Sequence, residues 1–509
     1  MKTHKIFGPP GTGKTTRLLS LLSSELENVS GEEIGYFTHT KAATRDAKER
    51  MHKSGTKYKD MKWVRTSHSA ACGLAGIGGP DIWGKKVDWE TLRDAGYMCK
   101  GSFDADDLGA DDTATWDATH FAYGVIRARR QTLPEGVLQF NQANGKLNLR
   151  SIEDFAVTYE RVKQELGRKD YNDMLTEYIE NDYGASPIKV LFLDEAQDFS
   201  KLQWDFITKL CAAGVERLYL AGDDDQAIFS FTGSDEYGFL DFPADVNEVL
   251  TKSWRCPIMV GEVAEKLTRK LLKRKEKAVE WQKKPGGVLW SGMRWEELNW
   301  LEHSKAEQQV MVLCRHRRRL WKVKQHLSRM GIPCSMDGKS SASKVVEIAI
   351  IYHDLRSERD VGKKEAARLL WWKGERKAAD RMRKSKDDRI NMKSKDMNLL
   401  KFEGDWIKYL AKTKDQVTEL NDLRTVLRIS GIDSVRKPPM IDVSTYHSSK
   451  GREADVVICL TDVSRAVNEE QIRNPDTEIR LAYVGLTRTK NRCIVLAPKR
   501  QQQMIGLRP

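Results

Sequence analysis

The sequence predicts an α/β protein built on parallel sheets, and three observations support this. A glycine-rich loop, GPPGTGKTT (8–16), stands between a short apolar strand and a helical stretch. Two continuous apolar runs, within VLFLDEAQD (190–198) and ERLYLAGDDDQ (216–226), end in carboxylates, as buried parallel strands often do. Strand and helix patterns alternate along much of the chain, which is typical of parallel sheets.

The predicted elements follow one another in chain order. A strand at 5–8 enters the glycine-rich loop, a helix at 15–26 leaves it, and another helix begins near Lys41. The remaining predicted strands share short apolar runs and lie at 34–40, 62–70, 190–198, 216–226, 310–316, 455–460 and 493–498. These runs have the length of strands in a soluble protein.

Two stretches interrupt this alternation. Residues 75–165 are irregular, with an acidic loop at 104–112 followed by a mixed helical pattern. Residues 341–435 are strongly helical and basic, with few strand signals. We interpret both stretches as insertions into the α/β core.

The composition favours a polyanionic partner. The chain has 509 residues, with 86 Lys and Arg against 73 Asp and Glu, which gives a formal charge of +13. No apolar run reaches the ~18–20 residues that cross a bilayer. The eight cysteines include no C-x-x-C pair, which argues against a zinc or iron–sulfur site. With no leader before the glycine-rich loop, we expect a cytoplasmic protein of a bacterial or phage-infected cell.

The glycine-rich loop matches the phosphate-binding pattern G-x-x-x-x-G-K-[ST]. Its glycines allow backbone amides to surround phosphates at the N-terminus of a helix. Lys14 is expected to contact the β- and γ-phosphates, and the Thr15 hydroxyl to bind Mg²⁺. The predicted nucleotide-binding residues of the loop are Gly8, Pro9, Pro10, Gly11, Thr12, Gly13, Lys14, Thr15 and Thr16.

The acidic motif after the run at 190–198 supplies the second half of a nucleotide site. Asp194 ends the apolar strand, where its carboxylate is expected to hold Mg²⁺. Glu195 is placed to orient or deprotonate the attacking water. The two motifs together predict a hydrolase of nucleoside triphosphates that uses ATP and Mg²⁺.

Further motifs make a specific resemblance. They stand in the order FTHTKAA (37–43), TSHS (66–69), DYNDML (170–175), LDEAQD (193–198), GDDDQAIFSFTG (222–233), KSWR (252–255), YHSSKGREAD (446–455) and RLAYVGLTR (480–488). With these motifs the chain resembles a superfamily 1 DNA helicase of the UvrD/Rep/PcrA type. The resemblance implies two RecA-like lobes with parallel sheets and two mostly helical insertions. The implied parts are a first lobe at 1–74 and 166–247 with an insertion at 75–165, and a second lobe at 248–340 and 436–509 with a basic insertion at 341–435.

The resemblance also implies roles around the nucleotide. Gln226 matches a glutamine that senses the γ-phosphate, and Arg255 and Arg488 match two arginines that reach that phosphate from the second lobe. Positive charge there suits phosphoryl transfer. Trp254 stands where the family usually has a tyrosine against the adenine ring, and Glu453 matches a glutamate near the nucleotide.

A second set of positions is implied to bind single-stranded DNA. Phe231 stands where the family places an aromatic residue that stacks on a base, an interaction that tolerates any sequence. Its neighbour Phe229 is expected to pack in the core. The other implied DNA-binding residues are Thr38, Thr40, Thr66, His68, Ser69, Arg315, His447, Ser448 and Lys450.

The chain departs from the family pattern in three ways. The segment MKTHKIF before Gly8 has no glutamine of the kind that reads adenine, so we expect relaxed selectivity for the nucleobase. Thr232 stands where the family usually has an arginine, which puts one contact between DNA and nucleotide in doubt. Both insertions are short for the family, and the small second one is expected to weaken engagement of duplex DNA.

Two basic stretches allow two interpretations each. RHRRRLWKVKQH (315–326) and KGERKAADRMRKSK (373–386) either form solvated helix faces or contact DNA phosphates. Trp371 and Trp372, which precede the second stretch, are expected in the core of the helical insertion.

The resemblance predicts an ATP-dependent DNA helicase with 3′→5′ polarity that acts on single strands and on junctions of single and double strands. The polarity comes from the family alone. One alternative is a translocase that strips proteins from single-stranded DNA with little unwinding. Another is a nucleotide switch or assembly subunit without motor activity, against which the intact nucleotide motifs argue. Neither DNA repair nor replication is singled out as the pathway that this motor serves.

Overall fold

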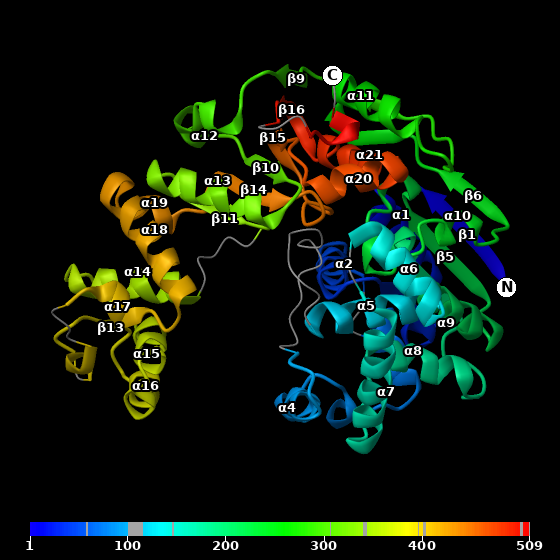
Figure 1. Ribbon diagram of the computed structural model, residues 1–509, viewed down its shortest axis with the longest axis horizontal. Coiled ribbons are helices and arrows are strands. Elements are labelled where there is room, and N and C mark those ends of the chain that lie inside the picture. The colour runs from blue at the N-terminus through cyan, green and yellow to red at the C-terminus, as the bar shows by residue number, and fades with distance from the viewer. Residues whose placement is uncertain are drawn as a thin grey trace. The chain divides into compact units, whose positions relative to one another are not determined.

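The computed structural model describes residues 1–56, 60–99, 116–144, 147–305, 307–338, 344–394, 396–400, 404–498 and 502–507 (Figure 1). The acidic loop predicted at 104–112 lies outside the described residues. The chain divides into two compact units, Met1–Ser291 with Thr461–Pro509, and Gly292–Leu460. Each unit is described by itself.

Six strands form a parallel sheet in the first unit, in the order β3-β2-β4-β5-β1-β6. The strands are β1 (Lys2–Phe7), β2 (Ile34–Thr38), β3 (Trp63–Thr66), β4 (Val190–Asp194), β5 (Arg217–Gly222) and β6 (Val246–Val249). β2 and β4 are buried along their whole length, which is why they read as apolar runs. Because the strands are parallel, the loops after β1, β4 and β5 lie at the same edge of the sheet.

Helices connect these strands. They are α1 (Lys14–Glu25), α2 (Lys41–Lys53), α3 (Ser67–Leu74), α8 (Tyr171–Glu180) and α9 (Lys201–Ala212). The Thr40 hydroxyl accepts a hydrogen bond from the Ala43 amide at the start of α2, and Thr66 accepts one from Ser69 at the start of α3. The strand predicted at 62–70 is wrong in its second half, because Thr66 caps a helix that begins at Ser67.

The first predicted insertion contains four described helices. These are α4 (Lys86–Asp94), α5 (Trp116–Ala128), α6 (Leu133–Asn144) and α7 (Leu149–Glu165). Figure 1 shows α5, α6 and α7 close together in cyan, and the three contact one another. Their core is aromatic: the rings of Phe155 and Tyr159 stack with centroids 5.5 Å apart, and His120 meets Tyr159 edge-on at 5.2 Å.

The second sheet also has six strands, in the order β11-β14-β10-β15-β16-β9. They are β9 (Gly287–Ser291), β10 (Val310–Cys314), β11 (Cys334–Met336), β14 (Ile441–Thr445), β15 (Ala454–Leu460) and β16 (Thr489–Leu496). The pairs β11–β14, β14–β10, β10–β15 and β16–β9 are parallel. Two sheets of this kind, flanked by helices, confirm the predicted α/β class.

The remaining elements are shorter. The first unit also holds the strand pair β7 (Lys252–Pro257) and β8 (Glu280–Gln282), and helices α10 (Gly238–Asp241), α11 (Ile258–Thr268), α20 (Arg465–Arg473) and α21 (Pro475–Leu486). The second unit also holds α12 (Trp300–Lys305) and α13 (Arg317–Arg329). No helix in the described part of the chain is long and apolar enough to span a membrane.

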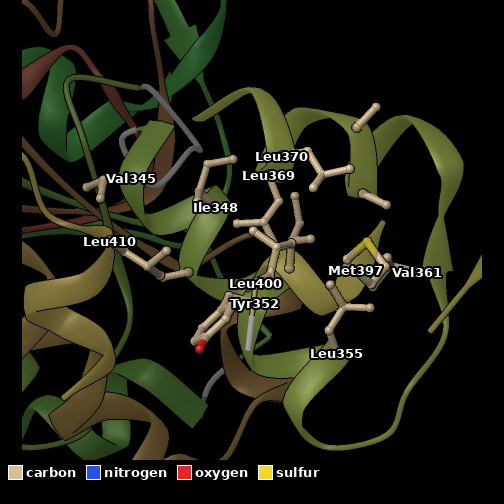
Figure 2. Close-up of a cluster of buried hydrophobic side chains, with 14 of the residues drawn as sticks. Val345, Ile348, Tyr352, Leu355, Val361, Leu369, Leu370, Met397, Leu400 and Leu410 are labelled. Atoms are coloured by element: carbon tan, nitrogen blue, oxygen red, sulfur yellow. The ribbon is translucent and has the colours of Figure 1, made fainter. Parts of the chain in front are cut away.

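The second predicted insertion is mostly helical around one apolar core. Its helices are α14 (Lys344–Arg356), α15 (Lys363–Trp372), α16 (Arg376–Arg383), α17 (Trp406–Leu410), α18 (Lys414–Ser430) and α19 (Asp433–Arg436), with a small pair β12 (Val361–Gly362) and β13 (Arg389–Ile390). Figure 2 shows Ile348 and Tyr352 of α14 beside Leu369 and Leu370 of α15 in this core.

The two tryptophans at the end of α15 differ in their environment. Trp372 packs against the core, and its indole donates a hydrogen bond to the carbonyl of Leu410. Trp371 is half exposed. The prediction that both lie in the core is correct for Trp372 and wrong for Trp371, because a helix end presents successive side chains to different faces.

Candidate active site

The glycine-rich loop runs from the end of β1 into α1. Gly11 and Gly13 have φ angles of 76° and 85°, a region that residues with a Cβ seldom adopt. A Cβ on Gly8 would collide with the side chain of Lys14. The Lys14 ammonium donates to the Gly8 carbonyl at 2.8 Å, which holds this charge over the loop.

Asp194 and Thr15 meet beside the loop. The Asp194 Oδ2 accepts hydrogen bonds from the Thr15 hydroxyl at 3.0 Å and from the Tyr36 hydroxyl at 2.8 Å. Burial, and next the nearby charge of Glu195, raise the pKa of Asp194 to about 6. A hydroxyl and a carboxylate side by side are oxygen ligands that suit Mg²⁺. The residues present therefore fit the predicted metal.

Glu195 is held in an unusual backbone conformation. Its φ is 52°, in the left-handed region, where a residue other than glycine is strained. The Glu195 carboxylate accepts a hydrogen bond from the Gln197 amide at 2.6 Å, and the other end of that amide accepts from the backbone N–H of Asp223 at 2.9 Å. Gln197 thus ties the loop after β4 to the loop after β5.

The same connection continues to Arg488. The Gln226 amide donates to the Asp223 carboxylate at 2.7 Å and accepts from the Arg488 guanidinium at 2.9 Å. Arg488 is buried, and its pKa is lowered to about 9, first by burial and then by the nearby Arg255. Two neighbouring guanidinium groups that repel each other are suited to an anionic phosphate.

Strand β7 lies against the glycine-rich loop. The Ser253 hydroxyl donates to the Pro10 carbonyl at 2.8 Å, and the Trp254 N–H donates to the Gly11 carbonyl at 2.9 Å. The Trp254 ring is exposed, with the Lys252 ammonium 4.1 Å from its centroid. A flat aromatic surface next to a phosphate loop suits a nucleobase.

Lys277 and Arg274 are part of this site but were not predicted from the sequence. The buried Lys277 ammonium lies 3.0 Å from Asp223, 2.5 Å from Asp224 and 3.0 Å from Asp225. Arg274 adds two hydrogen bonds to Asp225. The available signal was the run of three aspartates after an apolar strand, since buried carboxylates require counter-charges.

One predicted DNA-binding residue of the first unit, His68, lines a cavity of about 350 Å³. Among the lining residues are His68 and Thr232, with His39 next to Thr38 and Thr40 in the chain. Packing around the His68 ring lowers its pKa to about 4, so the ring is neutral at pH 7. The lining residues are His39, His68, Asp117, His120, Phe121, Gly124, Val125, Ala128, Asn172, Ser200, Gln203, Thr232 and Ser234.

Not every predicted contact is open to solvent. Thr38 is fully buried, and its hydroxyl donates to the Thr40 carbonyl at 3.0 Å, so it shapes the turn before α2. Ser69, in the first turn of α3, is exposed, and Phe231 is half-buried with its ring 6.3 Å from that of Phe229.

In the second unit, the predicted residues follow β10 and β14. Arg315 comes directly after β10, and His447, Ser448 and Lys450 follow β14. Because these strands are parallel neighbours, their ends lie at one edge of the sheet. His447 is buried, and the Ser448 hydroxyl lies 2.7 Å from that of Thr445. Glu453 lies just before β15.

Comparison with models of protein families identifies the family to which these motifs belong. The UvrD/REP helicase N-terminal domain matches residues 1–247, and the UvrD-like helicase C-terminal domain matches residues 362–499. The chain belongs to the UvrD/REP helicase family. This membership confirms the predicted relationship and the predicted enzyme class, an ATPase of a DNA helicase family.

Individual relatives are distant. A putative ATP-dependent DNA helicase, YjcD of Bacillus subtilis, is 30% identical over 134 residues, which are 24% of this chain and 18% of that protein. The ATP-dependent DNA helicase PcrA of Staphylococcus aureus is 22% identical over 293 residues, 54% of this chain and 39% of that protein. The chain thus matches less than half the length of either relative.

Among solved structures, the complex of the arterivirus nonstructural protein 10 helicase with DNA is similar. Its TM-score is 0.33 at 11% identity, with 99% of this chain and 63% of that chain covered.

Proposed function

We propose that the protein is an ATP-dependent motor that moves along single-stranded DNA and unwinds duplex with 3′→5′ polarity. The main support for this proposal is a chain of hydrogen bonds that runs from Glu195 through Gln197, Asp223 and Gln226 to Arg488. It joins a candidate catalytic carboxylate to a candidate phosphate-binding arginine. A change at the nucleotide can therefore reach Gln226, and the same loop after β5 leads on to Phe231, the proposed base-stacking residue. The polarity rests on the family resemblance.

The residues of the site suit hydrolysis of ATP. Lys14 and Thr15 would hold the phosphates and Mg²⁺, which neutralises charge on the phosphate oxygens when bound. Glu195, fixed by Gln197, would orient the attacking water. Arg255 and Arg488 would stabilise the charge that develops in the transition state.

The DNA-binding assignment is supported by charge and by the cavity. A net charge of +13 favours a polyanion, and the cavity is large enough for part of a nucleotide. The proposal assigns the single strand to Thr40, Thr66, His68, Ser69 and Phe231 in the first unit, with Thr38 shaping the turn before α2. In the second unit it assigns the strand to Arg315, His447, Ser448 and Lys450.

Strand displacement on two partial duplexes, one with a 3′ tail and one with a 5′ tail, tests this function. The proposal expects ATP-dependent displacement of the 3′-tailed substrate, abolished by Lys14→Ala. Displacement of only the 5′-tailed substrate would keep the motor and overturn its polarity. Absence of DNA-stimulated ATP hydrolysis would overturn the motor itself.

A translocase with little unwinding activity is the second candidate. It is favoured by the small helical region of the second unit, whose α14–α19 surround a single apolar core. This protein would hydrolyse ATP when DNA is added and displace a protein bound to a single strand, yet leave both tailed duplexes intact.

A further inference from the structure

Arg129, directly after α5, reaches from the first insertion to the loop that follows β5. Its Nη2 donates a hydrogen bond to the carbonyl of Ser230 at 2.6 Å. Ser230 begins a short turn, Ser230–Thr232, four residues after Gln226. The contact therefore links a helix of the insertion to the segment that carries the γ-phosphate glutamine.

The two neighbouring arginines show what is unusual about Arg129. Arg127 pairs with the carboxylates of Asp170 and Asp173, and the Arg130 Nε lies 2.8 Å from Asp205. Within the described residues, Arg129 has no carboxylate at ion-pair distance. Glu236 is near enough for its charge to favour the protonated form of Arg129, but its carboxylate pairs with Arg480 instead.

Arg129 is partly buried, and its charge there has no acidic partner among the described residues to compensate it. Burial lowers the pKa of Arg129 below its ordinary value, with only a partial opposing effect from Glu236. The guanidinium has five N–H donors, and its hydrogen bond to Ser230 uses one of them. A phosphate would supply the missing negative charge and accept from the remaining donors.

The cavity lies against the same helix end. Gly124, Val125 and Ala128 line it from α5, and Thr232 and Ser234 line it from the loop. The two walls are in close contact, since a Cβ on Gly233 would lie 3.0 Å from that of Ala128. Asp117, seven residues before Gly124, is the carboxylate among the lining residues, so an anion is expected at the Ala128 end.

We propose that Arg129 is a positioning residue that binds a phosphate of the DNA strand at the cavity and holds the 230–232 turn. Its guanidinium contacts the phosphate on one side and the Ser230 carbonyl on the other. Binding of DNA thereby fixes the loop that begins at Gln226 and stimulates ATP hydrolysis. The inference rests on the proposed function, because it requires a single strand in the first unit.

The test compares Arg129→Gln, Arg129→Lys and the control Arg130→Gln with the unaltered chain. Binding of a fluorescent oligo-dT is followed by anisotropy over a series of salt concentrations, and ATP hydrolysis is measured with and without DNA. We expect Arg129→Gln to raise the DNA concentration for half-maximal stimulation about tenfold. The slope of log affinity against log salt should fall by about 1, since one phosphate contact is lost.

The controls separate this role from a structural one. Hydrolysis without DNA should be unchanged in Arg129→Gln, Arg129→Lys should recover the salt slope, and Arg130→Gln should behave like the unaltered chain. An unchanged slope and half-maximal concentration in Arg129→Gln would overturn the proposal. Loss of DNA-free hydrolysis without recovery in Arg129→Lys would also overturn it. If the unaltered chain bound no oligo-dT, the proposed function itself would fail.

Discussion

The nucleotide site and the helical region of the second unit bury opposite kinds of side chain. In the nucleotide site, Asp194, Asp223, Gln226 and Arg488 are all buried, and each makes a hydrogen bond to another residue of the site. In α14–α18, the buried side chains are almost all aliphatic (Figure 2). None of the charged side chains described in these helices is buried.

This difference determines what a substitution does in each region. A buried polar network transmits the loss of one group to its neighbours, because each partner is left unsatisfied in a low dielectric. An aliphatic core loses stability according to the volume removed, with little change in chemistry elsewhere. The first region should therefore be sensitive in activity, and the second in stability alone.

Lys14→Ala should give the largest effect on activity. The Lys14 ammonium is the charge held over the phosphate loop, and its one hydrogen bond within the described residues goes to the Gly8 carbonyl. We expect hydrolysis of ATP to fall by roughly 10²–10³-fold. The midpoint of thermal unfolding should hardly change, since one backbone contact is lost. Steady-state kinetics measure the rate of ATP hydrolysis, and a thermal melt measures the unfolding midpoint. An unchanged rate of hydrolysis would show that Lys14 does not act in the nucleotide site.

Lys277→Met should damage both activity and stability. It leaves Asp223, Asp224 and Asp225 buried without their shared cation, while Arg274 still pairs with Asp225. Breaking such a buried pair costs about 3–5 kcal/mol of unfolding free energy.

Lys273→Met is the matched control for this change. Lys273 also pairs with an aspartate, Asp241, but both side chains are about half exposed, so the loss should be within about 1 kcal/mol. Urea denaturation compares the two variants. Equal losses would show that burial does not distinguish the two ion pairs.

Leu369→Ala should affect the second unit alone. Leu369 is fully buried in the core of α14–α18, and its truncation should cost about 2–5 kcal/mol. Hydrolysis without DNA should be retained, because Lys14, Asp194 and Arg488 lie in the first unit. Leu399→Ala, at a half-exposed position, is the control. A parallel fall in DNA-free hydrolysis would contradict the separation drawn between the two regions.

Linear patterns in the sequence revealed the chemistry of the nucleotide site but not its connections. The glycine-rich loop and the carboxylates after β4 were predictable, because strand ends in a parallel sheet meet at one edge. The bond between Gln226 and Arg488 joins residues 262 positions apart, and periodicity carries no information about such a pair. Lys277 was missed for the same reason, since its partners lie more than fifty residues earlier.

The prediction was weaker where local capping decided the structure. The stretch at 62–70 is predicted as one strand, yet the Thr66 hydroxyl caps α3 and the strand ends there. In the first insertion, aromatic contacts between Phe155, Tyr159 and His120 hold helices that a mixed pattern left undefined. The predicted DNA contacts stay predictions, because they depend on the strand that binds.

Trp254→Ala should give the smallest effect and mark the edge of the nucleotide site. Its backbone N–H is bonded to Gly11, so the ring stays beside the phosphate loop, but the ring itself is exposed. Loss of one aromatic stacking surface of this kind costs about 0.5–1.5 kcal/mol, which corresponds to a rise of up to about tenfold in KM for ATP. The turnover number should be preserved, because the exposed Trp254 ring offers a surface to the nucleobase and no charge to the γ-phosphate. Trp254→Phe should restore most of the affinity, and a fall in turnover with unchanged KM would place this ring in the polar network instead.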